Sequence, residues 1–591
     1  MRRFAAAFAA VLAASVFFSG CGGKRQEAPL GECAQAIWQT GRITKESPEW
    51  RDKKGPVYIT PRAEGRALME GMWVKGGRAP LEKAILKAYK KVGAKRDQVD
   101  WLEIDVAGES KPVSWKEIKK WDRGVLGLEI RYKGKTARYA PSYMIRSNRR
   151  FHRVRQLFRK ERDINETDAA KAEQYALFPA DQLLVNVKTG EVVPMERGNR
   201  TVRLEEVTRE SVAKAKDLAV QWLVNNIHED GGLTYKYWPS RGKKSKSNNA
   251  LRQWMATGAL CRAAKQANDP RLQELASQNI RYNLEHFYKE EGDYGLIERG
   301  GKVKLGALAL AAMALMEHPQ REQWKREEEK LLKLINAMWR PDGSFKTFYK
   351  PLGMGACQNF YPGEALLLWA KLYQEKKDAR LKERFMKSFA FYQEWHRKQR
   401  NPAFVPWHTQ AYYLMWKATK SPALKDFIFE MNDWLLAMQQ WKKDVPYADM
   451  WGRFYAPERN YGPPHASSTG VYLEGLADAW KLAKETGDAR RAEIYRTVIV
   501  RGLRSVLQFQ FSDDTDMFYI RKAKRPHVLG GIRTTEYDNV IRCDNVQHNL
   551  VAMLKILDAF EEKDFQNTDE TFEPSWNDEP SADVIKSYDA R

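Results

Sequence analysis

The chain has 591 residues and a hydrophobic content of 43%, which is normal for a globular protein and predicts two or three domains. Its 100 basic residues exceed its 76 acidic ones, and the formal charge of +24 favours anionic partners such as acidic glycans or lipid head groups. Five cysteines are too few for a disulfide framework, and no pair has metal-ligand spacing, so we expect neither a metal nor a cofactor.

The N-terminus has the three parts of a secretion signal. Arg2 and Arg3 precede an apolar run of 15 residues over 4–18, which is followed by Ser19 and Gly20. This run is shorter than the roughly 20 residues that a membrane-spanning helix needs. We therefore expect residues 1–20 to be a signal that is removed on export.

The tetrapeptide that ends this signal, Phe18-Ser19-Gly20-Cys21, resembles the lipobox of bacterial lipoproteins, with Phe where Leu is usual. The resemblance implies that Cys21 receives a diacylglycerol group and tethers the chain to a membrane by burying acyl methylenes, each worth about 0.8 kcal/mol. Gly22 favours the outer membrane. The alternative is an ordinary cleaved signal with an incidental cysteine. An exported chain does not normally meet chromosomal DNA, so we expect no nucleic-acid partner, and the sequence does not indicate an oligomeric state.

Residues 21–50 are polar and irregular and are interpreted as a tether, and residues 51–205 mix helical and strand patterns. A helix is predicted over 80–92, and residues 99–106 alternate apolar and polar side chains as a half-buried strand does. Two strands at 127–132 and 136–140 form a hairpin around a tight turn. With a helix from Phe151 and short strands near 182–186 and 191–194, the segment predicts an α+β domain.

The segment 146–162 is the densest basic stretch, with eight Lys or Arg among 17 residues. Phe151, Val154 and Phe158 recur at helical spacing, which predicts an amphipathic helix with a basic outer face. Two interpretations stay open: a solvated face, or a patch that binds a polyanion or a membrane surface.

The segment 51–205 resembles the AMMECR-type domain. The matching order is a helix, the strand Trp101–Val106, the strand Gly124–Tyr132, and Tyr139-Ala140-Pro141-Ser142 before a helix. The match covers about 110 residues, and the family's glycine-and-cysteine segment is not evident. Because that family has no clear activity, the resemblance implies a fold and no function.

From Ser211 to Lys563 only helical patterns remain. Twelve helices are predicted, over 212–227, 248–267, 270–288, 302–317, 319–338, 362–375, 378–398, 406–419, 422–440, 468–486, 488–510 and 543–562. Short links such as Asp269-Pro270 and Gly487-Asp488 alternate with long loops, and short links make antiparallel neighbours. Six such hairpins predict a mainly α fold, an (α/α)₆ toroid behind the smaller α+β domain.

The inner helices of this toroid should begin near residues 248, 302, 362, 406, 468 and 543. Small apolar runs such as 305–312 suit the crowded inside of a ring, and the charged run 322–333 suits an outer helix. The long loops then meet at one rim over the N-termini of the inner helices, where helix dipoles favour anions. Recurrent Asp-Gly loops are interpreted as structural turns. Acidic residues 564–591 predict a disordered tail.

Candidate site residues are the polar side chains in the first turns of the inner helices and in the loops before them. Glu364 and Glu474 are the best pair of carboxylates for acid–base work, and their separation would decide the reaction type. His408, His465 and His548 are the alternative acid–base set, and Asp544 could orient His548 at i, i+4 spacing. The expected substrate-binding residues are Tyr237, Asn249, Arg252, Lys304, Tyr361, Trp407, Gln410, His465, Arg533, Arg542 and Gln547. Each alone could equally be a capping or core residue.

The helical half resembles the six-hairpin superfamily of carbohydrate-active proteins, which includes uronyl epimerases, unsaturated glucuronyl hydrolases and toroidal lyases. No catalytic motif of any member matches, so no family active site is carried over. The resemblance implies a surface-tethered hydrolase, lyase or epimerase acting on an acidic glycan. The alternative is a non-catalytic glycan-binding or envelope-assembly lipoprotein. A toroidal enzyme acting on lipids is a third hypothesis, disfavoured by the polar and cationic rim.

Overall fold

The computed structural model describes residues 28–50, 53, 55–69, 71–75, 80–118, 123–165, 172–459, 461–566, 568 and 571. The expected signal over 1–20 and Cys21 lie outside the described residues. No helix within the described ranges has the length and apolar character needed to cross a membrane.

Six helices form a closed inner ring: α10 (Ala250–Ala267), α12 (Leu305–Glu317), α14 (Tyr361–Lys376), α16 (Val405–Thr419), α18 (Ala466–Glu485) and α20 (Cys543–Ala559). Each packs against the next in this order, and α20 packs back against α10. The fold is therefore mainly α, and the predicted (α/α)₆ toroid is confirmed. The run of small residues in α12 is buried along nearly its whole length because neighbours surround it on both sides.

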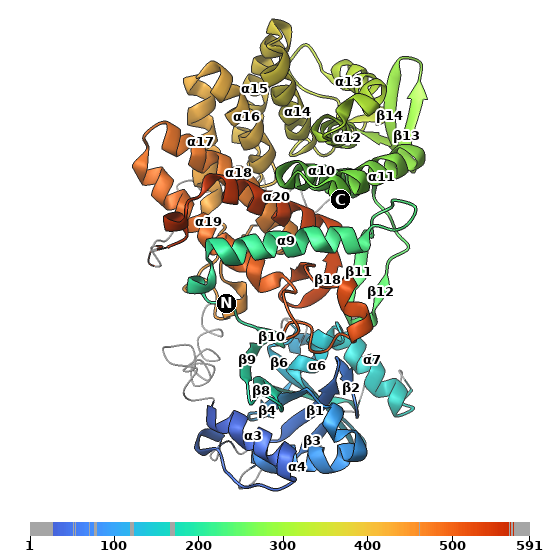
Figure 1. Ribbon diagram of the computed structural model, residues 1–591, viewed down its shortest axis with the longest axis vertical. Coiled ribbons are helices and arrows are strands. Elements are labelled where there is room, and N and C mark those ends of the chain that lie inside the picture. The colour runs from blue at the N-terminus through green and yellow to red at the C-terminus, as the bar shows by residue number, and fades with distance from the viewer. Residues whose placement is uncertain are drawn as a thin grey trace.

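Six outer helices surround the ring: α9 (Arg209–Asn226), α11 (Pro270–Phe287), α13 (Lys325–Met338), α15 (Ala379–Lys398), α17 (Pro422–Leu436) and α19 (Ala489–Phe509). Helices α11, α13, α15, α17 and α19 each pack against the inner helix before them in the chain, and α9 packs against α20 (Figure 1). The first and last helices of the toroid are thus neighbours in space.

The short link at Asp269 shows how the sequence turns the chain between an inner and an outer helix. Asp269 caps α11, because its Oδ1 accepts from the backbone N–H groups of Arg271 and Leu272, and Pro270 occupies the first helical position. Asn268 before it adopts a left-handed conformation and ends α10. Asp378 and Asp488 cap α15 and α19 in the same way.

The long loops pass over the neighbouring hairpin at a repeated glycine. Gly231, Gly343, Gly452 and Gly530 all have positive φ, and a Cβ at each would overlap a backbone carbonyl of another outer helix: α11, α15, α19 and α9 in turn. Only glycine combines this backbone conformation with so close an approach. The structural interpretation of the Asp-Gly loops is confirmed at Gly231 and Gly343.

Two small sheets cover the rim at the N-termini of the inner helices. One has the order β12 (Lys243–Lys244), β11 (Lys236–Trp238), β18 (Asp538–Arg542), β17 (Arg533–Thr535). The other has the order β13 (Tyr288–Glu291), β14 (Tyr294–Arg299), β15 (Lys302–Lys304), β16 (Phe348–Lys350). Strands β18 and β15 lead directly into α20 and α12, so their last residues lie at the mouth of the ring.

The N-terminal domain is built on a ten-stranded sheet with the main order β10 (Asn199–Arg200), β9 (Val192–Glu196), β8 (Gln174–Asn186), β4 (Trp101–Ala107), β1 (Val57–Ala63), β2 (Arg66–Ala67). The hairpin of β6 (Leu126–Tyr132) and β7 (Lys135–Tyr139) joins it through β8, β5 (Lys111–Val113) pairs with β8, and β3 (Met72–Val74) pairs with β1. The predicted strands at 99–106, 127–132, 136–140 and 191–194 and the helix at 80–92, α4 (Pro80–Val92), are confirmed.

Two expectations about this domain need correction. Residues 28–40, expected within a tether, form helix α3 (Ala28–Thr40), whose Leu30, Ala34 and Ile37 are buried against the sheet. The central strand β1 was not expected, because Pro61 and Arg62 interrupt its apolar pattern. Arg62 is tolerated there because it pairs with buried Glu103 at 2.6 Å.

The basic stretch forms helix α7 (Phe151–Glu161), as predicted, with Phe151, Val154 and Phe158 buried. Part of its charge is neutralised, since Glu173 pairs with Arg159 at 2.6 Å and with Arg155 at 3.8 Å.

Buried ion pairs and hydrogen bonds join the two domains. Arg197, on the N-terminal side, binds Asp449 of the toroid at 2.9 Å, with both side chains almost fully buried. Arg533, expected at the substrate site, instead donates to Asn199 and to the carbonyl oxygens of Phe509 and Gln508. This correction follows from the register of β17, which places Arg533 on the buried face of its sheet.

Candidate active site

The mouth of the ring carries a group of charged and aromatic side chains that we call the mouth cluster. Its members come from the starts of inner helices and the strands before them: Tyr235, Arg252, Lys304, Tyr361, Glu364, His465, Arg542 and Asp544. Arg252, Lys304 and Arg542 are partly exposed, whereas Glu364 and Asp544 are buried below them. Solvent therefore meets cations first and carboxyl groups second.

Asp544 holds two arginines in place. Its carboxylate accepts from Nε of Arg542 at 2.9 Å and lies 3.2 Å from Nε of Arg252. These two guanidinium groups outweigh the cost of burial and hold the pKa of Asp544 well below its usual range. A carboxylate with so low a pKa is a poor base, so its role in this arrangement is to orient the arginines.

Glu364 is the second buried carboxyl group of the cluster, and its pKa is shifted in the opposite direction to that of Asp544. Burial raises its pKa to about 8, and the charge of Arg252 offsets only part of that rise. Its Oε2 has no hydrogen-bond partner among the described residues, and Gly306 of α12 lies so close that a Cβ there would overlap it. Glu364 is therefore protonated at neutral pH, whereas Asp544 is ionised, and a protonated carboxyl group is what acid catalysis requires.

The remaining members surround these carboxyl groups. His465 caps α18 through Nδ1, which accepts from the backbone of Ser467 at 3.2 Å, and burial lowers its pKa to about 4. The ring of Tyr235 lies 5.9 Å from the guanidinium of Arg542. Tyr361, in the first turn of α14, is buried, and burial raises its pKa well above the usual range. Lys304 lies near enough to Arg252 for their charges to interact, and burial lowers its pKa.

A small cavity lies further along the ring axis. It has a volume of about 30 Å³, room for about two water molecules, and is lined by residues of five inner helices, including Met255, Trp407, Glu474 and Gln547. His548 donates to or accepts from Glu474, with Nδ1 and Oε1 2.7 Å apart. Met255 links this axial cavity to the mouth cluster, because its Sδ lies 3.2 Å from Nη1 of Arg252.

Ion pairs border this cavity and continue around the inner helices. Glu317 binds Arg262 at 2.7 Å and Lys371 at 2.8 Å, and these cations lower its pKa to about 2. Lys555 binds Asp478 at 2.6 Å and also donates to Oε1 of Gln410. Gln410 is thus part of a structural network rather than of the mouth.

The structure does not bring all the predicted site residues together. His408 is fully buried against the outer helices, with its ring stacked on Phe404 and close to Tyr392 and Tyr412, and burial lowers its pKa to about 3. It is a core residue, because the fourth helical position of α16 faces away from the axis, whereas Trp407 in the third position lines the axial cavity. Asp544 pairs with arginines and not with His548, whose partner is Glu474.

Two further corrections concern residues near the first inner helix. Tyr237 is buried on the inner face of β11 and packs against His527, so it does not join the cluster. Asn249 caps α10, accepting from the backbone N–H of Arg252, which fixes the position of that arginine.

Sequence reasoning missed Tyr235 and Cys357. Tyr235 lies just before β11, in a loop whose Gly and Thr residues gave no periodic signal. Cys357 interacts with Tyr361 and Lys304 from the loop before α14, where burial raises the pKa of its thiol. No three His, Cys, Asp or Glu side chains in the described ranges are grouped so that they could hold a metal ion.

No protein-family model matches the chain, and no curated protein matches it. Among solved structures, cellobiose 2-epimerase from Bacillus thermoamylovorans is 12% identical with a TM-score of 0.43, over 59% of this chain and 98% of its own. An α-1,6-mannanase of Salegentibacter is 11% identical with a TM-score of 0.41, over 59% and 98%. Unsaturated glucuronyl hydrolase from Streptococcus agalactiae is 13% identical with a TM-score of 0.40, over 60% and 94%. These likenesses are distant and do not define the chemistry of the ring.

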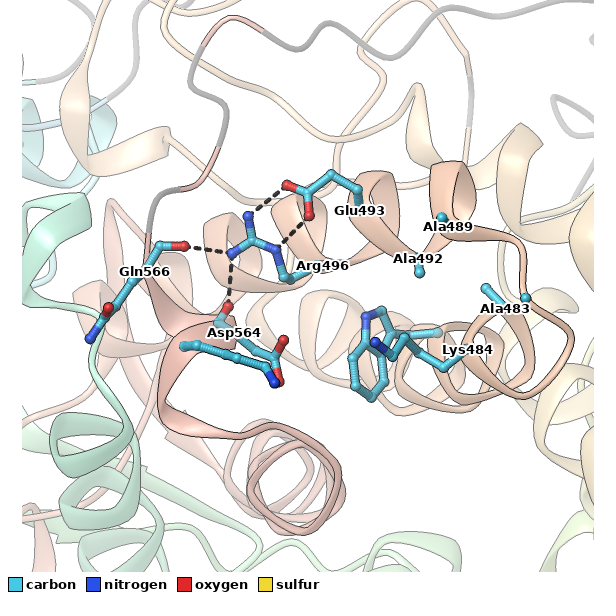
Figure 2. A pocket seen from close by; sticks show the side chains of 11 residues that line it. Ala483, Lys484, Ala489, Ala492, Glu493, Arg496, Asp564 and Gln566 are labelled. Atoms are coloured by element: carbon cyan, nitrogen blue, oxygen red, sulfur yellow. Dashed lines mark hydrogen bonds and ion pairs between the residues drawn. The ribbon is translucent and has the colours of Figure 1, made fainter.

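A larger cavity, of about 430 Å³, lies away from this site, between the α18–α19 hairpin and the segment after α20 (Figure 2). Arg496 crosses it, bound to Glu493 at 2.6 Å and to the carbonyl oxygens of Asp564 and Gln566 at 3.0 and 2.6 Å. Residues 564–566 of the expected tail are thus held against the toroid, and most of the tail lies outside the described residues. The cavity contains no predicted site residue.

Proposed function

We propose that the chain is a carbohydrate-active enzyme, a hydrolase, lyase or epimerase, that acts on an acidic glycan at the mouth of the ring. The observation that carries the proposal is the pairing of a protonated Glu364 with a cationic mouth in which Asp544 orients Arg252 and Arg542. The arginines would bind a uronate carboxylate bidentately, and Glu364 would donate its proton to the glycosidic or ring oxygen.

Glu474 and His548 supply the second half of the proposed chemistry. The contact on Nδ1 fixes the imidazole, as a carboxylate does in a hydrolase triad, and leaves Nε2 as the proton acceptor. Glu364 and Glu474 thus act separately in this proposal. Glu364 is an acid at the mouth, and Glu474, which lines the axial cavity, acts through the histidine that it contacts.

The test compares the wild type with Glu364→Gln and Glu474→Gln on a panel of uronic-acid glycans, measuring turnover by released ends or ring unsaturation and binding by calorimetry. We expect both variants to bind and to lose at least 100-fold in kcat. Asp230→Asn, which changes an exposed carboxylate in a loop, is the control and should retain full activity. Loss of binding together with turnover would argue against an acid–base role.

A second candidate is a non-catalytic receptor for the same glycan, as expected for an envelope-assembly lipoprotein. It is favoured by the small volume of the axial cavity, about 30 Å³, and by the ion pair that borders it. Binding without turnover of any glycan in the panel by the wild type would favour this receptor.

We also propose that Cys21 is lipidated and anchors the chain in the bacterial envelope, at the outer membrane. The lipobox resemblance and the short apolar run support this location. Cys21→Ala should move the protein from the membrane fraction to the soluble fraction, and mass spectrometry of the mature N-terminus should find a diacylglyceryl cysteine. An unmodified N-terminus at another residue would contradict the anchor.

We also infer that the N-terminal domain is of the AMMECR type. The order of its helices and strands supports this inference.

A further inference from the structure

The sheet next to the mouth has an outward face that the proposed chemistry does not use. Lys236 of β11 is the register partner of Arg542 of β18, and Trp238 is the partner of Lys243 of β12. Opposite residues in antiparallel strands point to the same face, and so do residues two apart in one strand. Lys236, Trp238, Lys243 and Arg542 therefore share one face, which we call the sheet platform.

Burial shows that this face is the outer one. Tyr237 and Ile541, which occupy the alternate positions, are buried, whereas Lys236, Trp238 and Arg542 are partly exposed and Lys243 is exposed. Figure 1 shows β11, β12 and β18 at the edge of the toroid, beside the N-terminal domain. The backbone of Trp238 is fixed by its pairing with Lys243 of β12, and its side chain is partly exposed to solvent.

The platform is strongly cationic. Five of the eleven residues from 236 to 246 are Lys or Arg, and none is acidic. Lys524 of the neighbouring short helix η8 (Lys522–His527) lies against Gly242 in the turn between β11 and β12, and it adds to this charge. A chain of uronate groups would meet a matching potential here.

Tyr235 connects the platform with the mouth cluster. The ammonium of Lys236 lies 5.0 Å from the centre of its ring, and the guanidinium of Arg542 lies 5.9 Å from it on the mouth side. Lys243, Lys236 and Arg542 thus follow one another across β12, β11 and β18, and the last of them is the arginine that Asp544 holds.

We propose that the sheet platform binds the part of an acidic glycan that extends out of the ring mouth, so that the ligand is a polyuronate chain rather than a single acidic sugar. Trp238 would stack on a sugar ring, and Lys236 and Lys243 would bind carboxylates on either side of it. This inference rests on the proposed function, because it assigns the substrate class of the same mouth.

The test uses digalacturonate and hexagalacturonate, with dimannuronate and hexamannuronate as the second uronate series, and measures affinity by calorimetry in low salt. Trp238→Ala and the double variant Lys236→Ser/Lys243→Ser change only the platform. The double variant Lys382→Ser/Lys387→Ser removes two exposed charges from the outer helix α15 and is the charge-matched control. Thermal melts check that each variant folds like the wild type.

We expect each platform variant to bind the hexamer about tenfold more weakly and the dimer as well as the wild type does, while the control binds both normally. The wild type should also lose more affinity with added salt than the double lysine variant. Wild-type hexamer affinity in the platform variants, an equal loss for the dimer, or no binding of either series by the wild type would each overturn the inference. Platform-dependent binding without turnover would instead reject only the catalytic proposal.

Discussion

Glu474 and His548 face one another from neighbouring inner helices, with Oε1 of Glu474 2.7 Å from Nδ1 of His548. Helices α18 and α20 pack closely along the ring, so this pair is fixed by the toroid itself rather than by a loop. Trp407 lies beside it, its ring centre 6.1 Å from that of the imidazole. Glu474 and Trp407 line the axial cavity, and His548 contacts both of them.

This pair leads to a prediction about the histidine. His548→Gln should lower kcat by about 100-fold or more, with little change in KM. This is the usual contribution of a positioned general base to the rate. His408→Gln is the matched control, because that buried histidine lies in the core and not at the cavity. It should lower the melting temperature and leave kcat per folded molecule unchanged. Equal losses of kcat in the two variants would contradict the assignment.

Glu364 predicts an unusual dependence of stability on pH. Its pKa is about 8 in the folded protein and 4.5 in the unfolded chain, so between these values the folded state binds the extra proton. Stability then falls as the pH rises from about 4.5 to 8, by on the order of 1.4 kcal/mol per pH unit at most. Glu364→Gln should remove this slope in urea titrations, and it should be more stable than the wild type at pH 8.5.

The same proton sets the alkaline limit of activity. Turnover by the wild type should decline above about pH 8, when Glu364 loses the proton that it donates. The dependence of kcat on pH measures this limit. An activity that stays constant up to pH 10 would exclude Glu364 as the acid.

His408 predicts a loss of stability in acid. Its pKa is about 3 when folded and about 6.5 when unfolded, so acidification below 6.5 protonates the unfolded chain first and favours unfolding. His408→Phe keeps the stacking on Phe404 and should reduce the slope of stability against pH between 4 and 6.5 by about one proton. Denaturant midpoints at several pH values measure it. A slope in His408→Phe equal to that of the wild type would contradict this prediction.

The repeated glycine of the long loops predicts a large cost for a single methyl group. Gly452→Ala combines a φ of +87° with overlap on the carbonyl of Arg501, and should cost more than about 2 kcal/mol. Gly353→Ala has a similar φ of +82° but no atom within 4 Å of the added Cβ, so it should cost only about 1 kcal/mol. Chemical denaturation compares the two, and equal costs would mean that the close approach is unimportant.

The interface between the domains should depend on Arg197. Arg197→Met would leave the buried Asp449 without this partner and should cost about 3–5 kcal/mol. The double variant Arg197→Met/Asp449→Asn should recover much of that loss, because the unpaired charge is gone. Calorimetric melts measure both. No recovery in the double variant would show that packing, and not the ion pair, holds the interface.

Much of the fold could be predicted because the toroid is repetitive. The alternation of short and long links fixed which helices are neighbours, and the starts of α10, α14, α16 and α20 fall within two residues of the prediction. The N-terminal sheet was harder, because β1 and the first half of β8 contain proline. An alternation of apolar and polar residues does not predict such strands, because their pairing depends on residues that are distant in the sequence.

The site was predictable only in part. Arg252, Glu364 and Asp544 were expected from their places in first turns, which all face one rim. Which partner each one takes could not be read from spacing: Asp544 and His548 are four apart on one helix, yet Asp544 binds arginines and His548 binds Glu474. The direction in which a side chain points could not be predicted either, since His408 is in a first turn but points away from the ring axis.

Because α9 and α10 both pack against α20, the last helix of the toroid in the sequence closes the ring. During synthesis or export the first five hairpins emerge with one flank of α10 still uncovered. Neither Asp544 nor His548 has yet appeared at that stage. A product truncated before Cys543 would thus have an open ring, exposed apolar side chains on α10 and an incomplete site, and it would be prone to aggregate until α20 is in place.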